Sequence, residues 1–170
     1  METATDLRAT AAAVARGELS ALSFLGLTAK DGEVFAGFAA ALLNRGKTSK
    51  AAACAQLAVA LAPGDGLAWL VLGCARARLG QDAAALAAYE TAARLKPESA
   101  RVWVDLAELA LARLDHTTAC AALRCALAVD PAGRTPAGAR AQWIIARTVR
   151  ELGGGSATER RASSQRGTPL

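Results

Sequence analysis

Histidine and cysteine are the side chains in this sequence that could bind a transition metal. His116 and Cys120 are four residues apart, a spacing that places both on one face of a helix. A stable zinc site usually has three or four protein ligands. His116 is the one histidine in the sequence, and the other cysteines, Cys54, Cys74 and Cys125, form no CxxC pair. We therefore interpret the cysteines as small packing or groove residues and predict no metal site.

A second motif fits a relaxed phosphate-loop pattern. Residues 41–48 read ALLNRGKT, with alanine at the first glycine position. An authentic phosphate loop follows a buried strand and needs a glycine-rich backbone whose N–H groups surround the phosphates. Here the four residues between Ala41 and Gly46 are LLNR, which contain no glycine, and the helical run VFAGFAAA overlaps the start of the motif. We therefore interpret Gly46 as a turn between two helices and Thr48 as the cap of the second helix.

Nucleophilic catalysis is not indicated either. His116 is the one histidine that could act as a base, and no serine or cysteine stands at a spacing that identifies it as a partner nucleophile. We predict that the chain is not an enzyme and that it uses no cofactor.

The net charge of +5 raises the question of nucleic-acid binding. Residues 1–133 carry 13 basic and 13 acidic residues, and residues 134–170 carry seven arginines against Glu151 and Glu159. The excess charge therefore lies at the C-terminal end, whereas a nucleic-acid footprint would cover a face of the folded domain. We predict no nucleic-acid partner.

The composition favours one helical domain with a tail. Apolar residues make up 53% of the 170 residues and aromatic residues 4%, and alanine, the best helix former, dominates. The sequence has no stretch of 18 uncharged apolar residues, so it does not predict a membrane span. The N-terminal sequence METATDLRATAAAVARGEL has no long apolar run and does not predict a signal peptide. We expect a cytoplasmic protein, and the high alanine and arginine content suggests a bacterial source.

Three prolines mark an internal repeat. Pro63, Pro97 and Pro131 stand 34 residues apart, in the settings ALAP, RLKP and AVDP. This is the length of one tetratricopeptide repeat (TPR), a pair of antiparallel helices, and the sequence resembles the TPR superfamily. The middle copy matches the TPR pattern at Trp69, Leu72, Gly73, Gly80, Ala85, Tyr89, Ala92 and Pro97. The third copy matches at Trp103, Leu106, Ala119, Ala126 and Pro131, and the first at Phe35, Gly46, Ala51, Ala58 and Pro63.

The resemblance implies an all-α fold, a right-handed α-solenoid of three TPR helical hairpins with an N-terminal helix and a C-terminal capping helix. The expected parts are an N-terminal helical extension (1–31), three repeats within 32–131 (32–65, 66–99 and 100–133), a capping helix (134–152) and a disordered basic tail (153–170). Helices are expected near residues 32–45, 48–61, 66–79, 82–95, 100–113 and 116–129.

Several local features of this fold are predicted as well. Aspartates are expected to cap three of the helices, namely Asp65, Asp82 and Asp115. The aromatic residues Trp69, Tyr89 and Trp103 are expected to pack between repeats instead of stacking on bases. One apolar stripe of the capping helix is expected to comprise Trp143, Ile144, Ala146 and Val149.

The first helix of each TPR pair lines a concave surface, so the resemblance also implies the residues of a peptide-binding groove. These are Ala36, Ala40, Leu43 and Asn44, then Leu67, Leu70, Cys74 and Arg78, and finally Arg101, Val104, Glu108 and Leu111. The surface is mostly small and apolar, which favours an apolar or amphipathic segment of another protein as the partner. Whether the chain forms a homodimer stays open at this point.

The first two repeats also resemble the type III secretion chaperones that hold hydrophobic translocator subunits before export. The segments that carry this resemblance are LGLTAKDGEVFAGFAAALLNRGKTSKAAACAQLAVALAP and GLAWLVLGCARARLGQDAAALAAYETAARLKP. It implies a chaperone that keeps an apolar export substrate soluble in the cytoplasm. The alternative is a generic TPR scaffold or adaptor subunit of a larger bacterial protein complex.

Overall fold

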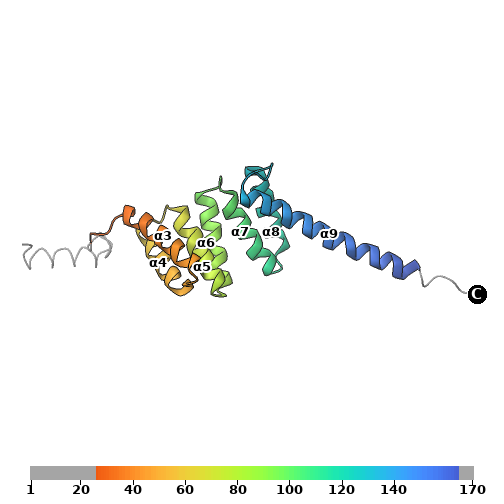
Figure 1. The fold of residues 1–170 in the computed structure, drawn as a ribbon, viewed down its shortest axis with the longest axis horizontal. Coiled ribbons are helices and arrows are strands. Elements are labelled where there is room, and N and C mark those ends of the chain that lie inside the picture. Colours follow the sequence, from red (N-terminus) through yellow and green to blue (C-terminus); the bar gives the residue numbers. More distant parts are fainter. Residues whose placement is uncertain (1–25, 165–170) are drawn as a thin grey trace, which may run out of the picture. The chain divides into compact units, whose positions relative to one another are not determined.

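The computed structural model describes the backbone of residues 26–164 and the side chains of residues 26–150. All regular structure in this part of the chain is helical (Figure 1). The helices are α3 (Ala29–Asn44), α4 (Thr48–Leu61), α5 (Gly66–Arg78), α6 (Asp82–Leu95), α7 (Ala100–Ala112), α8 (His116–Val129) and α9 (Pro136–Ser164). The predicted all-α class and the three helical hairpins are therefore confirmed. The predicted N-terminal helix lies outside the described residues.

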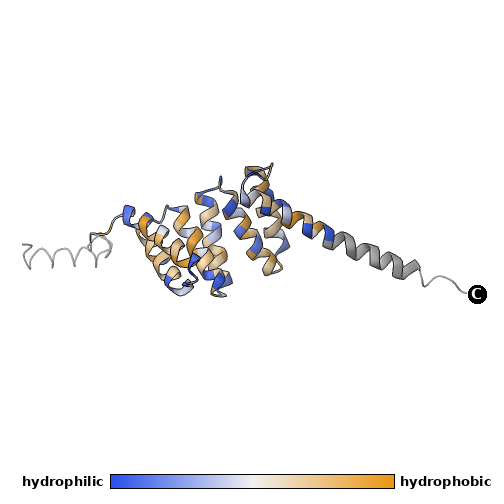
Figure 2. Ribbon diagram, viewed as in Figure 1, coloured by the Kyte–Doolittle hydropathy of each residue, from blue (hydrophilic) through white to orange (hydrophobic). Residues whose placement is uncertain are grey.

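The chain divides between Lys96 and Pro97 into two compact units. The first unit contains the hairpins α3–α4 and α5–α6, which pack against each other. The second contains the hairpin α7–α8 together with α9, which packs on both of its helices. In Figure 2, hydrophilic residues gather toward the ends of the helices and in the turns of each unit, while apolar residues run along the helices.

Helix α3 begins three residues before the predicted start, because a capping motif extends it. The backbone N–H of Thr28 donates a hydrogen bond of 2.8 Å to the carboxylate of Asp31, and the Thr28 hydroxyl donates another of 2.7 Å. The hydroxyl bond is the main reason that the pKa of Asp31 lies below its usual value. The carboxylate also stands in the first turn, where a negative charge is favoured.

The core of the first unit is built from small residues that let helices approach closely. Buried alanines of α3, α4 and α5, among them Ala39, Ala51 and Ala75, surround Leu72, which is 2% exposed. Gly73 faces the ring of Tyr89 so closely that a Cβ atom added there would lie 2.6 Å from Cδ1 of the tyrosine. The small residue of the TPR pattern is thus required by the packing of an aromatic ring on the helix backbone.

The turn inside each hairpin uses a residue with positive φ at the same place in the repeat. Gly46 and Gly80 have φ angles of 73° and 72° there, which glycine adopts without steric cost. Leu114 occupies the equivalent place in the third repeat with φ at 61°, and its side chain is 77% exposed. The departure from the TPR pattern therefore replaces the residue type without changing the turn conformation.

The two repeat tryptophans make the same hydrogen bond in different hairpins. The indole N–H of Trp69 donates to the carbonyl of Pro63, and that of Trp103 donates to the carbonyl of Pro97, each at 2.8 Å. Each bond ties the first helix of a hairpin to the proline turn before it. Trp69 also packs against the alanine-rich core of the first unit. Its place in the structure is that of a packing residue.

Two of the predicted N-caps are confirmed and two assignments are wrong. Asp65 accepts a hydrogen bond from the N–H of Leu67 and Asp115 one from the N–H of Thr118, as N-cap residues do. Asp82 is instead the first helical residue of α6, and Gln81 is its N-cap. Thr48 likewise begins α4 behind the N-cap Lys47. In both cases the preceding residue already departs from helical backbone angles, so the polar side chain falls one position inside the helix.

Helix α9 starts at a cap built around Asp130. The Asp130 carboxylate accepts hydrogen bonds from the N–H groups of Arg134 (3.0 Å) and Thr135 (2.7 Å) and from the Thr135 hydroxyl (2.7 Å). The Thr135 hydroxyl in turn accepts from the N–H of Gly138 at 3.0 Å. Helix α9 continues to Ser164, past the predicted end of the capping helix at residue 152 and into the segment from residue 153 that was predicted to be a disordered tail. The alanine, glutamate and arginine residues of the segment ATERRA favour a helix in spite of the preceding glycines.

Candidate peptide-binding site

A pocket of about 630 Å³ lies between the C-terminal half of α7 and helix α9 in the second unit. We call it the α7–α9 pocket. Its lining residues are Glu108, Leu111, Ala112, Leu114, His116, Arg140, Trp143, Ile144, Arg147 and Thr148. Two predicted groove residues, Glu108 and Leu111, thus meet side chains of the capping helix.

One wall of the α7–α9 pocket is held by an ion pair between its two helices. Arg140 Nη2 donates to Glu108 Oε2 at 2.9 Å, and Arg140 Nε donates to Glu108 Oε1. This two-point arrangement fixes the orientation of both side chains. It also raises the pKa of the Arg140 guanidinium above its usual value, because the carboxylate favours the charged form. The predicted groove residue Glu108 is therefore committed to a contact within the chain.

Other residues of the pocket lining combine apolar surface with positive charge. Trp143 is 58% exposed, and the Arg147 guanidinium lies over its ring at 5.4 Å from the centroid. Leu111 is half-buried, Leu114 is exposed, and Ile144 is buried and forms part of the apolar base. A tryptophan with one open face beside leucines is a surface that a partner's apolar side chains can cover.

The predicted groove residues of the first unit differ widely in accessibility. Ala36, Leu43 and Leu70 are buried, whereas Ala40 and Cys74 are half-buried. Asn44, Leu67 and Arg78 are exposed. The buried members cannot contact a partner in this conformation and instead belong to the apolar core.

Arg78 links the two hairpins of the first unit. Its Nη1 donates a hydrogen bond of 2.8 Å to the backbone carbonyl of Leu43, near the C-terminal end of α3. The last carbonyls of a helix lack partners within the helix and carry partial negative charge, so a cation is favoured there. The residue predicted to line a groove therefore also serves the packing of one repeat on the next.

The predicted groove residues of the second unit are also unequal. Val104 is 1% exposed, while Arg101 is exposed and forms an ion pair of 3.6 Å with Asp105 one turn along α7. Glu108 and Leu111 are both half-buried and both line the α7–α9 pocket.

Sequence analysis missed the contributions of α9 to this site. Trp143 and Ile144 were expected to belong to one packing stripe with Ala146 and Val149, and this expectation is wrong. Ala141 and Ile144 are the buried apolar residues, whereas Trp143 is 58% and Val149 63% exposed. The buried stripe follows Gly138, Ala141 and Ile144, three residues apart, because Gly138 packs directly on Asp130. The three-residue spacing of these small and apolar residues was the sequence signal that could have identified the buried stripe.

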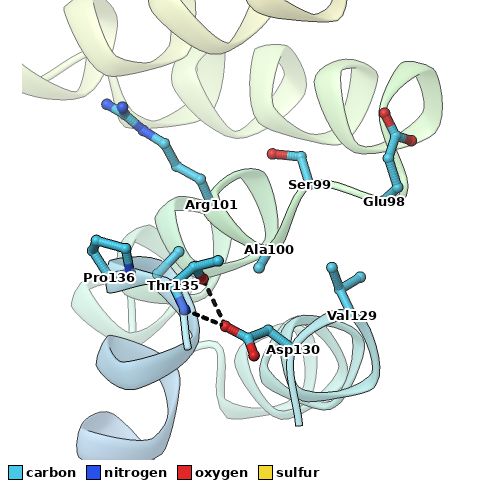
Figure 3. A pocket seen from close by; sticks show the side chains of 9 residues that line it. Glu98, Ser99, Ala100, Arg101, Val129, Asp130, Thr135 and Pro136 are labelled. Atoms are coloured by element: carbon cyan, nitrogen blue, oxygen red, sulfur yellow. Dashed lines mark hydrogen bonds between the residues drawn. The ribbon is translucent and has the colours of Figure 1, made fainter. Parts of the chain in front are cut away.

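A second pocket, of about 570 Å³, lies at the start of α9 and does not offer a reactive group (Figure 3). Asp130 lies in its wall, 8% exposed, and its carboxylate is occupied by the Thr135 and Arg134 bonds described above. These bonds, that of the Thr135 N–H first, lower the pKa of Asp130. The carboxylate is thus held ionised as a helix cap and is a poor proton acceptor.

Within residues 26–150, no three or more His, Cys, Asp or Glu side chains cluster in a way that could hold a metal ion. Burial raises the pKa of the Cys54 thiol, which makes it less nucleophilic at neutral pH. Among the helices of the described region, none is long and apolar enough to cross a membrane.

Comparison with known proteins places the fold among TPR domains. No protein-family model matches the sequence, and no curated protein sequence matches it. Solved structures do match. A T3SS complex from Aeromonas hydrophila aligns with a TM-score of 0.68 and 20% identity over 85% of this chain and 97% of that one. The first TPR of Spaghetti (RPAP3) bound to an HSP90 peptide aligns with a TM-score of 0.66 and 15% identity over 75% and 97%.

The Yersinia enterocolitica type III secretion chaperone SycD, in complex with a peptide of the translocator YopD, is also similar. It aligns with a TM-score of 0.59 and 21% identity over 68% of this chain and 93% of that chain. These identities establish the likeness of the fold alone. The chain has a TPR fold, as the 34-residue period predicted.

Proposed function

We propose that this protein is a peptide-binding TPR module that holds an apolar or amphipathic segment of a partner protein. The observation that carries the proposal is the α7–α9 pocket, where Leu111 of the predicted groove lies beside the half-exposed Trp143. Tryptophan and leucine surfaces in a concave site release water when covered, at about 25 cal/mol per Å² before the entropy cost of binding.

The lining of the pocket indicates which kind of segment it would hold. Glu108 is neutralised by Arg140, so the pocket presents apolar surface next to the Arg147 guanidinium and His116. A partner segment that presents apolar residues on one side fits this apolar surface.

The finer role that we propose is that of a cytoplasmic chaperone for a hydrophobic translocator of a type III secretion system. Support comes from the resemblance of the first two repeats to such chaperones and from the shared fold with SycD, which was solved with a translocator peptide. The alternative, a scaffold subunit, predicts a soluble, folded partner instead of an aggregation-prone one.

The test is a pull-down from native lysate with wild-type protein, Leu111→Glu and Val149→Glu. Leu111→Glu places a charge inside the pocket, while Val149→Glu makes the same change at an exposed site of α9 outside the pocket lining. We expect Leu111→Glu to lose the partner at least tenfold while Val149→Glu retains it. Leu70 is not suitable for this test, because it is 6% exposed and a charge there would disturb folding.

Expression of the captured partner with and without this protein separates the two finer roles. A partner that precipitates when expressed without this protein, and stays soluble with it, supports the chaperone. A partner that is soluble and folded by itself supports the scaffold. Equal binding by Leu111→Glu and wild type would overturn the assignment of the pocket.

A further inference from the structure

One face of α3 exposes apolar side chains in a regular stripe. Val34 is 71% exposed and Phe38 56% exposed, and Ala41 is exposed as well. The three residues follow the i, i+4, i+7 spacing that places them on one side of a helix. We call this stripe the α3 outer face.

The repeat period shows what these positions do elsewhere. Residues 34 positions later are Ala68, Leu72 and Ala75, which are 0%, 2% and 0% exposed. They are buried because they belong to core clusters formed with α3 and α4 of the preceding hairpin. The same positions are thus packing positions in the second repeat. In the first repeat two of the three carry larger apolar side chains, Val34 in place of Ala68 and Phe38 in place of Leu72.

We propose that residues 19–25 of the same chain cover the α3 outer face. This segment, LSALSFL, lies outside the described residues and has five apolar residues in seven, none of them charged. It ends just before Gly26, whose φ of 73° begins a three-residue connection to the first residue of α3. Glycine adopts this left-handed conformation, which is common in tight turns, without steric cost.

The reach of the segment fits the size of the face. At 1.5 Å per residue, Val34 and Ala41 are about 10 Å apart along α3, which is about the length of seven helical residues and less than half that of seven extended ones. A segment tethered by three residues has an effective concentration of about millimolar or more. At ordinary protein concentrations it therefore outcompetes a second copy of the chain that presents similar surface.

The test is limited chymotrypsin cleavage of the full chain at the Phe24–Leu25 bond, measured by mass spectrometry for wild type, Phe38→Glu and Val149→Glu. If the segment is packed on α3, Phe38→Glu accelerates cleavage at this bond at least tenfold. Val149→Glu, an equally drastic change at a similarly exposed residue, leaves the rate unchanged. Leu19→Glu changes the covering segment and leaves α3 intact. The proposal predicts that it accelerates cleavage to the same extent as Phe38→Glu.

Light scattering at several protein concentrations tests whether a second copy of the chain covers the α3 outer face instead. The proposal predicts protection of the Phe24–Leu25 bond that does not change on dilution. It is overturned if wild type and Phe38→Glu are cleaved at equal rates. It is also overturned if protection disappears on dilution together with a dimer that Phe38→Glu dissociates, because a second copy then covers the face. Unchanged helical circular dichroism of Phe38→Glu shows that faster cleavage is not unfolding.

Discussion

Arg140 on α9 binds both carboxylate oxygens of Glu108 on α7, with the Nη2–Oε2 distance at 2.9 Å. The pair joins the capping helix to the first helix of the third hairpin and closes one wall of the α7–α9 pocket. The Arg140 side chain is 60% exposed and that of Glu108 32% exposed, so water and salt screen their attraction. The pair therefore positions α9 more than it stabilises the fold.

This screening predicts a small effect of removing the pair. Arg140→Ala should lower the free energy of unfolding by about 0.5–1 kcal/mol, the range of exposed ion pairs with good geometry. Urea denaturation at low and high salt measures it, and the loss should shrink at high salt. Arg101→Ala, which breaks the longer pair with Asp105 within α7, should cost less. A loss of several kcal/mol for Arg140→Ala would show that the pair carries more of the packing than its exposure indicates.

The contact between Gly73 and Tyr89 predicts a steric effect. Gly73→Ala places a methyl group 2.6 Å from the tyrosine ring, which must shift, so we expect a loss of about 1–3 kcal/mol in the free energy of unfolding. Gly64→Ala is the control, because a Cβ atom there meets nothing within 4 Å. The control should change stability by less than about 0.5 kcal/mol in the same urea titration. Equal stability of Gly73→Ala and wild type would contradict the described packing.

The strained turn at Leu114 offers a stabilising change. Its φ of 61° costs a residue with a Cβ atom about 1 kcal/mol or more, and its exposed side chain packs little. Leu114→Gly should therefore raise the melting temperature. Gly80→Ala, which introduces a Cβ atom at the equivalent position with φ at 72°, should lower it. Differential scanning calorimetry of the two variants is the measurement. The account of these turns fails if both variants shift the melting temperature in the same direction.

Asp115 predicts a specific dependence of stability on acid. Hydrogen bonds from Thr118, its side chain first, and then from Thr117 lower the pKa of Asp115 from 3.8 to about 2 in the folded protein. The folded state thus binds this proton less readily than the unfolded state, so the stabilisation is present above pH 3.8 and is lost as the pH falls toward 2.

Comparison of wild type with Asp115→Ala isolates this contribution. The variant should be less stable at pH 6, and the difference between the two proteins should narrow between pH 4 and pH 2, as followed by the urea midpoint. Asp31 and Asp130 also have lowered pKa values, but both proteins retain them, so their contribution cancels. A difference that is independent of pH would show that Asp115 acts without its charge.

The sequence was sufficient to predict most helix boundaries because the signals were local. Proline ends and small residues in a 34-residue period located the second helices at 48–61, 82–95 and 116–129, which are the observed bounds. The start of α3 was missed because the bond between Thr28 and Asp31 extends the helix into a segment with no apolar period.

The candidate site was predictable only in part, because it depends on how α9 packs. Its orientation follows from the cap at Asp130 and from the close approach of Gly138 to that side chain, which join residues of different elements. The TPR pattern identifies α7 residues such as Leu111 but says nothing of which α9 side chains face them. Trp143 therefore looked like a packing residue, although it is more than half exposed.

The most direct test of the central claim is site-specific photo-crosslinking in the native cell. A benzophenone amino acid is placed at position 143, in the α7–α9 pocket, and separately at the exposed position 149 outside the pocket lining. The account predicts that position 143 crosslinks to one apolar or amphipathic segment of a single partner, that Leu111→Glu abolishes this product, and that position 149 gives none. Crosslinks from position 149 but not from 143, or a product at 143 that persists in Leu111→Glu, would contradict it.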